Sequence, residues 1–337
     1  MESILAVTFP FFALVLLGYA AAQRRVLPES AIPGLNTYVL FFALPCLLFR
    51  FGASMPFAKL IDPALMAAYG LCALATVMLT IALTRRRHVG GRGVGLRDAA
   101  FGALVAAFPN TGFMGVPLLV ALLGERAAGP AIGTILIDLI VTSSLCIAIA
   151  QAQPDPSHTL GDDGLTRSQD TLAGLLRSLR GAMTNPLPWA IGLGALFAAS
   201  GYTLPSPLDQ VIRMLGDSAS PVALFTIGAV LWRAGQHSHT RTAPRDYLPV
   251  VAIKLLLHPL LVLGAGLALR AAGIDVPSFG LMVIVLVAAL PSASNVSLLA
   301  ERFGADNGRV ARIIMATTVL SFATFTLVAW AFGVQGR

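Results

Sequence analysis

Long apolar runs separated by short polar stretches dominate the chain. A helix rises about 1.5 Å per residue, so about 20 mostly apolar residues cover the ~30 Å hydrocarbon core of a bilayer. Ten stretches meet this requirement, and we call them spans one to ten. They are about 3–22, 33–51, 64–84, 98–123, 130–151, 185–203, 208–232, 248–271, 277–301 and 309–333. Because unpaired backbone groups are not tolerated in lipid, the pattern predicts an all-α membrane protein with ten transmembrane helices.

The composition agrees with a lipid environment. Of the 337 residues, 56% are hydrophobic and 12% are charged, whereas soluble domains carry about 25% charged residues. The cysteines Cys46, Cys72 and Cys146 lie in apolar runs without a CxxC or Cys/His cluster, so no disulfide framework, zinc site or other metal site is expected.

The basic residues indicate an orientation. Most of the 23 lysines and arginines fall in loops on one side if the N-terminus is outside. This bias predicts a multi-pass protein with both termini outside, and it explains the net charge of +7 without a nucleic-acid partner. The first run follows Glu2 and precedes Arg24 and Arg25, the reverse of a signal peptide, so we expect it to be retained as a helix.

The longest polar stretch divides the chain into two halves of five spans. Residues 152–184 are rich in aspartate and proline and read as a cytosolic linker between a first repeat, 1–151, and a second repeat, 185–337. With an odd number of spans in each half, the second half enters the membrane in the opposite direction. This is the geometry of an inverted repeat.

Matching proline-containing segments support the repeat. Spans two and seven carry Pro45 and Pro221, and spans four and nine carry Pro109 and Pro291. A proline within a helix removes one N–H group and clashes with the carbonyl four residues earlier. In spans four and nine the prolines are followed by small and polar residues, so the sequence predicts two broken helices rather than the simple kinks that are the alternative.

Such breaks expose backbone donors and acceptors at membrane depth, where half-helix N-termini suit an anion such as a carboxylate. The candidate substrate-binding residues are Pro109, Asn110, Thr111, Gly112, Pro291, Ser292, Ser294 and Asn295.

Three titratable side chains in the spans are candidates for coupling or charge compensation. Asp138, in an apolar run, could carry a coupling proton or serve as a structural partner for another helix. Lys254 and His258 share one face of span eight, where they could neutralise Asp138 or attract an anion. The alternative for His258 is a hydrogen bond to backbone freed by Pro259. Arg213 and Asp217 lie four residues apart near the outer end of span seven, and we expect them to form an interfacial ion pair.

The segment Phe108-Pro-Asn-Thr-Gly-Phe-Met-Gly-Val-Pro117 resembles the span-four signature of the auxin efflux carrier family. That family includes plant PIN-type auxin exporters and bacterial malonate or malate permeases. Ala289–Asn295, Leu35-Asn36 with Ala43-Leu44-Pro45, and Lys254 with His258-Pro259 also resemble it, and the resemblance covers essentially the whole chain.

The resemblance implies two inverted five-helix repeats, akin to bile-acid/sodium symporters, with spans four and nine crossed at their prolines. Spans one, two, six and seven would form a scaffold, and spans three to five and eight to ten a moving transport unit. Asn110 matches a substrate-contacting asparagine, and Asn295 is a counterpart. The short linker resembles the bacterial type, which implies a bacterial inner membrane, and related carriers often form homodimers.

The leading functional hypothesis is a secondary carrier for a small mono- or dicarboxylate. It would work without a cofactor, coupled to H⁺ or Na⁺ or driven by the substrate's own gradient. A GxxxxGK[ST] loop is absent, so the chain is not itself an ATP-driven motor, and the absence of HExxH disfavours a membrane-embedded enzyme. A channel-like or sensor protein is the remaining alternative.

The predicted topology can be tested by chemical labelling. A single cysteine placed within 155–170, in a variant lacking the natural cysteines, should react with an impermeant maleimide only from the cytosolic side. Reaction in intact cells, from outside, would contradict the orientation.

Overall fold

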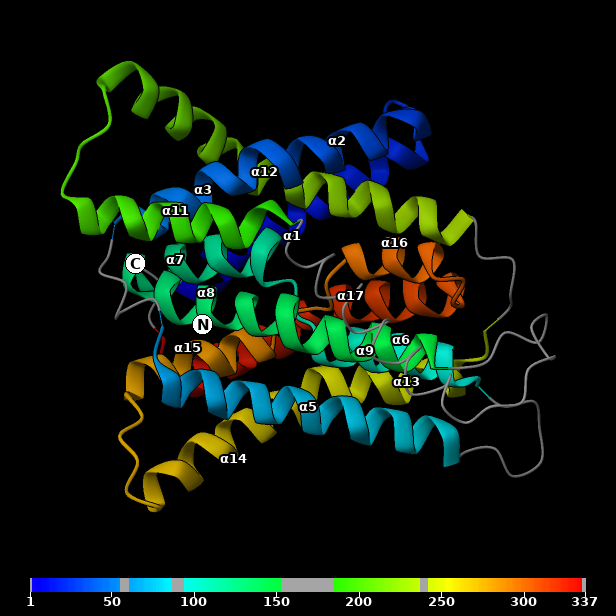
Figure 1. The fold of residues 1–337 in the computed structure, drawn as a ribbon. Coiled ribbons are helices and arrows are strands. Elements are labelled where there is room, and N and C mark those ends of the chain that lie inside the picture. The colour runs from blue at the N-terminus through cyan, green and yellow to red at the C-terminus, as the bar shows by residue number, and fades with distance from the viewer. Residues whose placement is uncertain (1, 55–60, 87–93, 153–184, 237–241, 335–337) are drawn as a thin grey trace, which may run out of the picture.

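The computed structural model describes residues 2–54, 61–86, 94–152, 185–236 and 242–334. In these residues every regular element is helical, apart from one isolated antiparallel bridge between Pro109 and Ser292 (Figure 1). Most of the linker 152–184, with its labelling positions, lies outside the described residues.

The first half contains α1 (Glu2–Gln23), α2 (Ile32–Tyr38), α3 (Leu44–Ala53), α5 (Pro63–Arg86), α6 (Leu96–Ala107), α7 (Val116–Leu123), α8 (Ala128–Ile137) and α9 (Ser143–Gln151). The second half contains α11 (Pro186–Ser200), α12 (Ser206–Gln236), α13 (Pro244–Ala252), α14 (His258–Ala271), α15 (Ser278–Ala288), α16 (Asn295–Arg302) and α17 (Asn307–Ala331).

Seven helical stretches among the described residues are long and apolar enough to cross a membrane. They are Glu2–Gln23, Glu29–Ala53, Pro63–Arg85, Glu125–Gln151, Ser206–Gln236, Pro244–Ala271 and Asn307–Ala331. The apolar helices Thr111–Leu123, Pro186–Ser200 and Ser278–Ala288 are shorter. They belong to spans four, six and nine, so the count of ten complete spans stays a prediction.

The predicted interruptions of spans four and nine are confirmed. The helix ends at Ala107 and resumes at Thr111 in one, and it ends at Ala288 and resumes at Asn295 in the other. The prolines of spans two and seven behave differently. Pro45 lies in the first turn of α3, and Pro221 lies inside the continuous helix α12.

Four spans contain a π-helical turn, a local widening of the helix that often occurs at functional sites. The turns are Val39–Ala43, Thr111–Gly115, Asp138–Thr142 and Ile253–Leu257. Three of these turns include residues of the predicted site, namely Thr111 with Gly112, Asp138 and Lys254. The locally altered backbone is therefore concentrated around the residues that the sequence singled out.

Two helix pairs approach each other so closely that their backbones touch. A Cβ atom on Gly18 of α1 would collide with the Phe225 carbonyl of α12, and one on Gly228 of α12 would collide with the Val15 carbonyl of α1. The same reciprocal contact joins α3 and α11 through Gly52 and Gly194. Small residues allow this close packing between membrane helices. In Figure 1, α2, α3, α11 and α12 lie along one side, and α5 and α14 lie along the opposite side.

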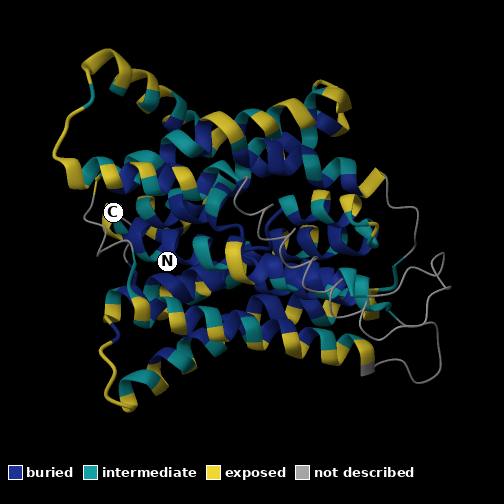
Figure 2. Cartoon of the chain, viewed as in Figure 1, coloured by how far each residue is buried: buried dark blue, intermediate teal, exposed yellow. Residues whose placement is uncertain are grey.

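Burial follows the same layering. Dark blue, buried residues concentrate in the central helices, whereas the outer helices carry exposed positions (Figure 2). Many exposed positions are large and apolar, including Leu16, Leu193, Leu260 and Val319. Such faces are typical of helices that contact lipid.

The close contact between α3 and α11 predicts a position-specific loss of stability. Gly194→Ala should lower the melting temperature of the detergent-purified protein by several degrees, because overpacking typically costs about 1–3 kcal/mol and a backbone carbonyl has little room to move. Gly192→Ala is the matched control, since a Cβ at Gly192 has no neighbour within 4 Å. Equal melting temperatures for the two variants would contradict the packing described here.

Candidate functional site

The two helix breaks meet and pair through their backbones. The Asn110 N–H donates to the Pro291 carbonyl at 2.8 Å, and the Ala293 N–H donates to the Phe108 carbonyl at 3.0 Å. These two bonds form the antiparallel bridge between Pro109 and Ser292. Each break thereby supplies partners for backbone groups that the other break removed from its helix, as an apolar environment requires.

Side chains complete the backbone pairing at the prolines. In an unbroken helix the Val105 carbonyl would accept from the N–H of residue 109, but Pro109 has none. The Ser292 hydroxyl donates to that carbonyl instead, at 2.8 Å. The Ser292 N–H in turn donates to Thr317 Oγ1 at 3.2 Å.

Lys254 has the corresponding role in span nine. The Ala288 carbonyl would accept from the Ser292 N–H in a continuous helix, but that N–H is directed to Thr317. The Lys254 ammonium donates to Ala288 O at 2.7 Å. Lys254 is fully buried, and we infer that its charge is partly balanced by the negative end of the α15 dipole.

A small cavity of about 40 Å³ lies at the junction. Two polar atoms there, Thr111 Oγ1 and Asn295 Oδ1, are buried and have no hydrogen-bond partner among the described residues. Asn110 is 4% exposed and Thr111 is 2% exposed. Buried polar groups are normally paired, so unpartnered atoms at a cavity indicate a place for a polar ligand.

The structure brings most of the predicted binding residues to this cavity. Its walls include Pro109, Asn110, Thr111, Gly112, Asn295 and Asp138. Pro291 and Ser292 build the bridge beside it. Ser294 is buried in the segment before α16, where its carbonyl accepts from Ser297 N at 3.2 Å, and it does not line the cavity.

The sequence reasoning missed Asn185, which also lines the cavity. Asn185 is the N-cap of α11, and its Oδ1 accepts from the Leu187 N–H at 3.0 Å. An asparagine directly before Pro-Leu-Pro at the start of an apolar run is a recognisable N-cap pattern. The sequence does not show that α11 begins beside the two helix breaks, and this position is what makes Asn185 part of the cavity wall.

Asp138 is fully buried beside the cavity and is held by two hydroxyl groups. Tyr69 Oη donates to its Oδ2 at 2.7 Å, and Thr142 Oγ1 donates to its Oδ1 at 3.1 Å. Tyr69 belongs to α5, so the carboxyl group joins span three to span five. Both oxygens are satisfied by the protein itself.

His258 lies between Tyr69 and Lys254. The ring centroids of Tyr69 and His258 are 5.8 Å apart, and Lys254 Nζ lies 3.5 Å from His258 Nδ1. No ion pair joins Lys254 to Asp138 in the described part of the chain, and the expected bond from His258 to backbone near Pro259 is not formed there. His258 Nε2 has no partner among the described residues.

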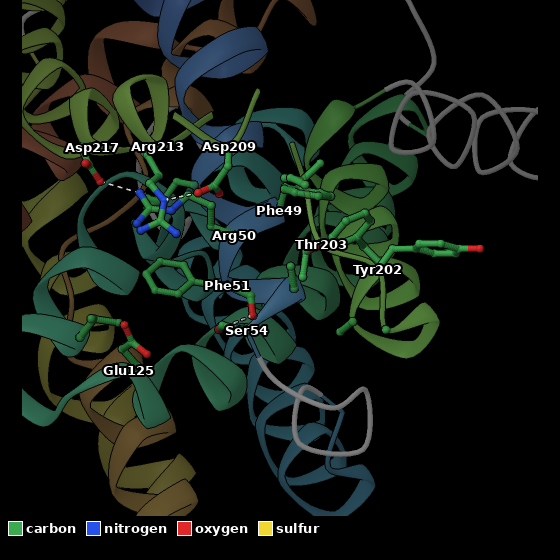
Figure 3. A pocket seen from close by; sticks show the side chains of 17 residues that line it. Phe49, Arg50, Phe51, Ser54, Glu125, Tyr202, Thr203, Asp209, Arg213 and Asp217 are labelled. Carbon is green, nitrogen blue, oxygen red and sulfur yellow. Dashed lines mark hydrogen bonds and ion pairs between the residues drawn. The ribbon is translucent and has the colours of Figure 1, made fainter. Parts of the chain in front are cut away.

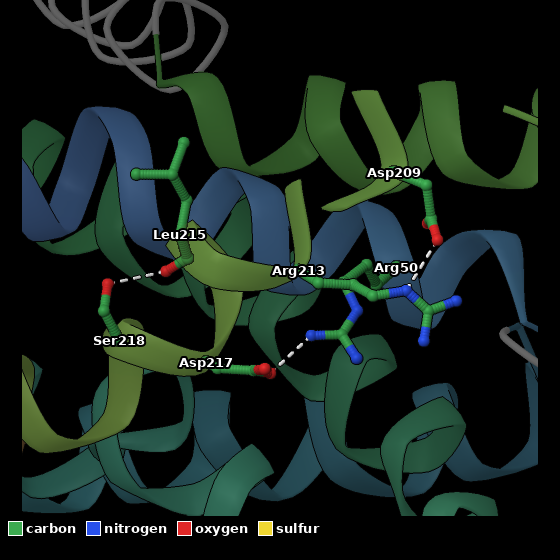
Figure 4. Close-up of polar contacts among 6 residues, drawn as sticks. All are labelled: Arg50, Asp209, Arg213, Leu215, Asp217 and Ser218. Carbon is green, nitrogen blue, oxygen red and sulfur yellow. Dashed lines mark hydrogen bonds and ion pairs between the residues drawn. The ribbon is translucent and has the colours of Figure 1, made fainter. Parts of the chain in front are cut away.

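A larger cavity of about 690 Å³ lies elsewhere, between α3, α11, α12 and the end of α7 (Figure 3). The predicted Arg213–Asp217 pair is wrong. The Arg213 guanidinium instead pairs with the Asp209 carboxylate, one turn earlier, with an N–O distance of 2.6 Å. The Asp217 carboxylate pairs with the guanidinium of Arg50 from α3, at 2.5 Å (Figure 4). With Glu125, the lining of this cavity carries three carboxylates and two arginines, and none of the predicted substrate-binding residues lies in it.

Sequence comparison identifies relatives of this chain. The profile of a family described as "Membrane transport protein" matches residues 3–330. The chain is 29% identical to the "Putative malonate transporter" of Rhizobium meliloti (strain 1021), over 97% of this chain and 95% of that protein. It is 26% identical to "Auxin efflux carrier component 8" of Arabidopsis thaliana, over 86% of each chain.

A third relative is the "Uncharacterized transporter YfdV" of Escherichia coli (strain K12). The identity is 28%, over 93% of this chain and 92% of that protein. These relatives are named as transporters rather than enzymes. The family profile covers nearly all of the chain, and the proline-containing segments of spans four and nine resemble the same family. The protein therefore belongs to the membrane transport protein family of auxin efflux carriers.

Proposed function

We propose that this protein is a secondary carrier that moves a small mono- or dicarboxylate by alternating access. The observation that carries the proposal is the cavity where two broken helices meet. Asn110 and Thr111 line it, and Thr111 Oγ1 is buried with no hydrogen-bond partner among the described residues. Amide and hydroxyl donors in an apolar surrounding suit a carboxylate. The name of the Rhizobium relative, "Putative malonate transporter", supports the same substrate class.

The proposed architecture is two inverted five-helix repeats, 1–151 and 185–337. Its support is the pairing of the breaks and the reciprocal glycine contacts. If span one corresponds to span six and span two to span seven, the α1–α12 pair corresponds to the α11–α3 pair. Both pairs have two glycines in backbone contact, and equivalent contacts are expected for two repeats of the same fold.

These close-packed helices would form the scaffold, and spans three to five and eight to ten would form the transport unit. A cavity of about 40 Å³ is little larger than the ~30 Å³ share of one liquid water molecule. A dicarboxylate therefore requires the two groups of helices to separate. Relative movement of scaffold and transport unit would supply that space and expose the site to each side of the membrane in turn.

We propose H⁺ as the coupling ion, carried by Asp138, with Na⁺ as the alternative. Asp138 lines the cavity and is hydrogen-bonded only to hydroxyl groups among the described residues. A carboxyl group in that setting can gain or lose a proton without breaking an ion pair. The proposed location is a bacterial inner membrane with both termini outside, and the chain could act as a homodimer.

Removal of the Asn110 amide tests the binding site. In proteoliposomes, Asn110→Ala should reduce saturable uptake of labelled carboxylates by about 10–100-fold, because a hydrogen bond to a charged group contributes about 1.5–3 kcal/mol. Asn36→Ala is the matched control, since Asn36 lines a separate cavity between α2, α12 and α16. Wild-type uptake kinetics in Asn110→Ala would remove the proposed site, and unsaturated conductance would favour a channel.

Replacement of Asp138 tests the coupling. Asp138→Asn keeps the shape but removes the titratable group, so uptake should lose its stimulation by an imposed proton gradient while counterflow of unlabelled for labelled substrate continues. The measurement is initial uptake rate against external pH, with and without sodium. An unchanged pH profile would assign Asp138 a structural role as the partner of Tyr69 and Thr142.

A further inference from the structure

Resting on the proposed function, we infer that Asn185 is a second substrate-binding residue, contributed by the scaffold, which holds the second carboxylate of a dicarboxylate substrate. Asn185 lies at the start of α11, and both it and Leu187 line the cavity at the helix breaks. No other residue of α11 lines this cavity. The other scaffold residues in the wall are Leu40 and Leu44, so Asn185 is the polar residue that the scaffold contributes to this cavity.

The N-cap bond decides which way the amide points. Asn185 Oδ1 accepts from the Leu187 N–H at 3.0 Å, and this fixes the oxygen toward the helix. The NH₂ group of the same amide is therefore turned away from the helix. Because Asn185 lines the cavity, the two N–H donors of this amide would meet a ligand bound there.

The start of α11 makes the amide the main donor there. Pro186 and Pro188 have no N–H, and the Leu187 N–H is already bonded to the cap. The 15-residue helix still contributes the partial positive charge of its N-terminus. An anionic group at this wall would thus be bound by one side-chain amide in a favourable field.

The wall from the broken helices carries its own unused polar atoms. Thr111 Oγ1 is buried and unpartnered among the described residues, and Thr111 is 2% exposed. Asn295 Oδ1 is unpartnered in the same way, and the Asn110 side chain belongs to this wall as well. Asp138 also faces the cavity, with both carboxyl oxygens accepting from Tyr69 and Thr142.

Donors on two different walls match a molecule with acceptors at both ends. A short dicarboxylate would place one carboxylate at Asn110 and Thr111 and the other at Asn185. A monocarboxylate would satisfy one wall and leave a desolvated donor on the other, which is the situation that allows strong discrimination. Because Asn185 belongs to the scaffold, its contact would form only when the transport unit brings the substrate beside α11.

Two substitutions of Asn185 distinguish a role in substrate binding from a role as a helix cap. Serine is as good an N-cap as asparagine, whereas alanine is a poor one. Asn185→Ser should therefore keep the melting temperature of the wild type but raise the KM for labelled malonate and succinate by about 10–100-fold. Asn185→Ala should show the same transport defect with a lower melting temperature. The KM for acetate or propionate should change by less than about threefold in both variants, since a monocarboxylate uses the other wall.

The outcomes distinguish this inference from the proposed function. Wild-type malonate and succinate kinetics in Asn185→Ser, with a defect only in Asn185→Ala, would reduce Asn185 to a helix cap. Equal losses for mono- and dicarboxylates, or a wild-type protein that carries only monocarboxylates, would also overturn the dicarboxylate site while leaving the carrier intact. Absence of saturable counterflow for every carboxylate in the wild-type protein would overturn both.

Discussion

Every backbone N–H and C=O group that leaves a helix inside a membrane must find another partner, and this requirement shapes the centre of the protein. Two prolines open two helices, and the freed groups are paired across the junction by Asn110 with Pro291 and by Ala293 with Phe108. The breaks are therefore mutually dependent, because neither would be tolerable in lipid without the other. The candidate binding site lies in the space that this junction leaves.

The same requirement explains residues whose sequence context suggested direct contact with substrate. Ser292 supplies the donor that Pro109 cannot, and Lys254 supplies a donor to the carbonyl released at Ala288. Both side chains thus stabilise the opened backbone. Thr111 Oγ1 and Asn295 Oδ1 are left without a partner among the described residues and remain available to a ligand. Asn185 adds a donor from a helix that is distant in sequence.

Packing elsewhere in the molecule is of two kinds. The α1–α12 and α3–α11 pairs are in glycine-mediated backbone contact, which leaves little room for the helices to slide. The cavity at the junction is instead bordered by side chains such as Leu40, Leu44 and Phe113. Movement between helix groups at such a side-chain boundary needs less rearrangement than movement within a backbone-contacting pair. This difference supports the proposed division into a scaffold and a transport unit.

The sequence alone determined that the chain is helical, membrane-embedded and interrupted at Pro109 and Pro291, because apolar run length and proline chemistry act locally. It also identified Asn110, Thr111 and Asn295 as candidates, since polar residues next to a break have few other uses in an apolar run.

Only the tertiary structure decided which side chains pair with one another. The spacing of Arg213 and Asp217 suggested an ion pair, but Arg50 from a neighbouring helix takes Asp217. Lys254 was a candidate to neutralise Asp138 or to attract an anion, and the structure shows its ammonium bonded to the Ala288 carbonyl. Asn185 was overlooked because its place in the cavity depends on where α11 begins relative to two distant breaks. Pairing across helices depends on three-dimensional distances, which local patterns in the chain do not contain.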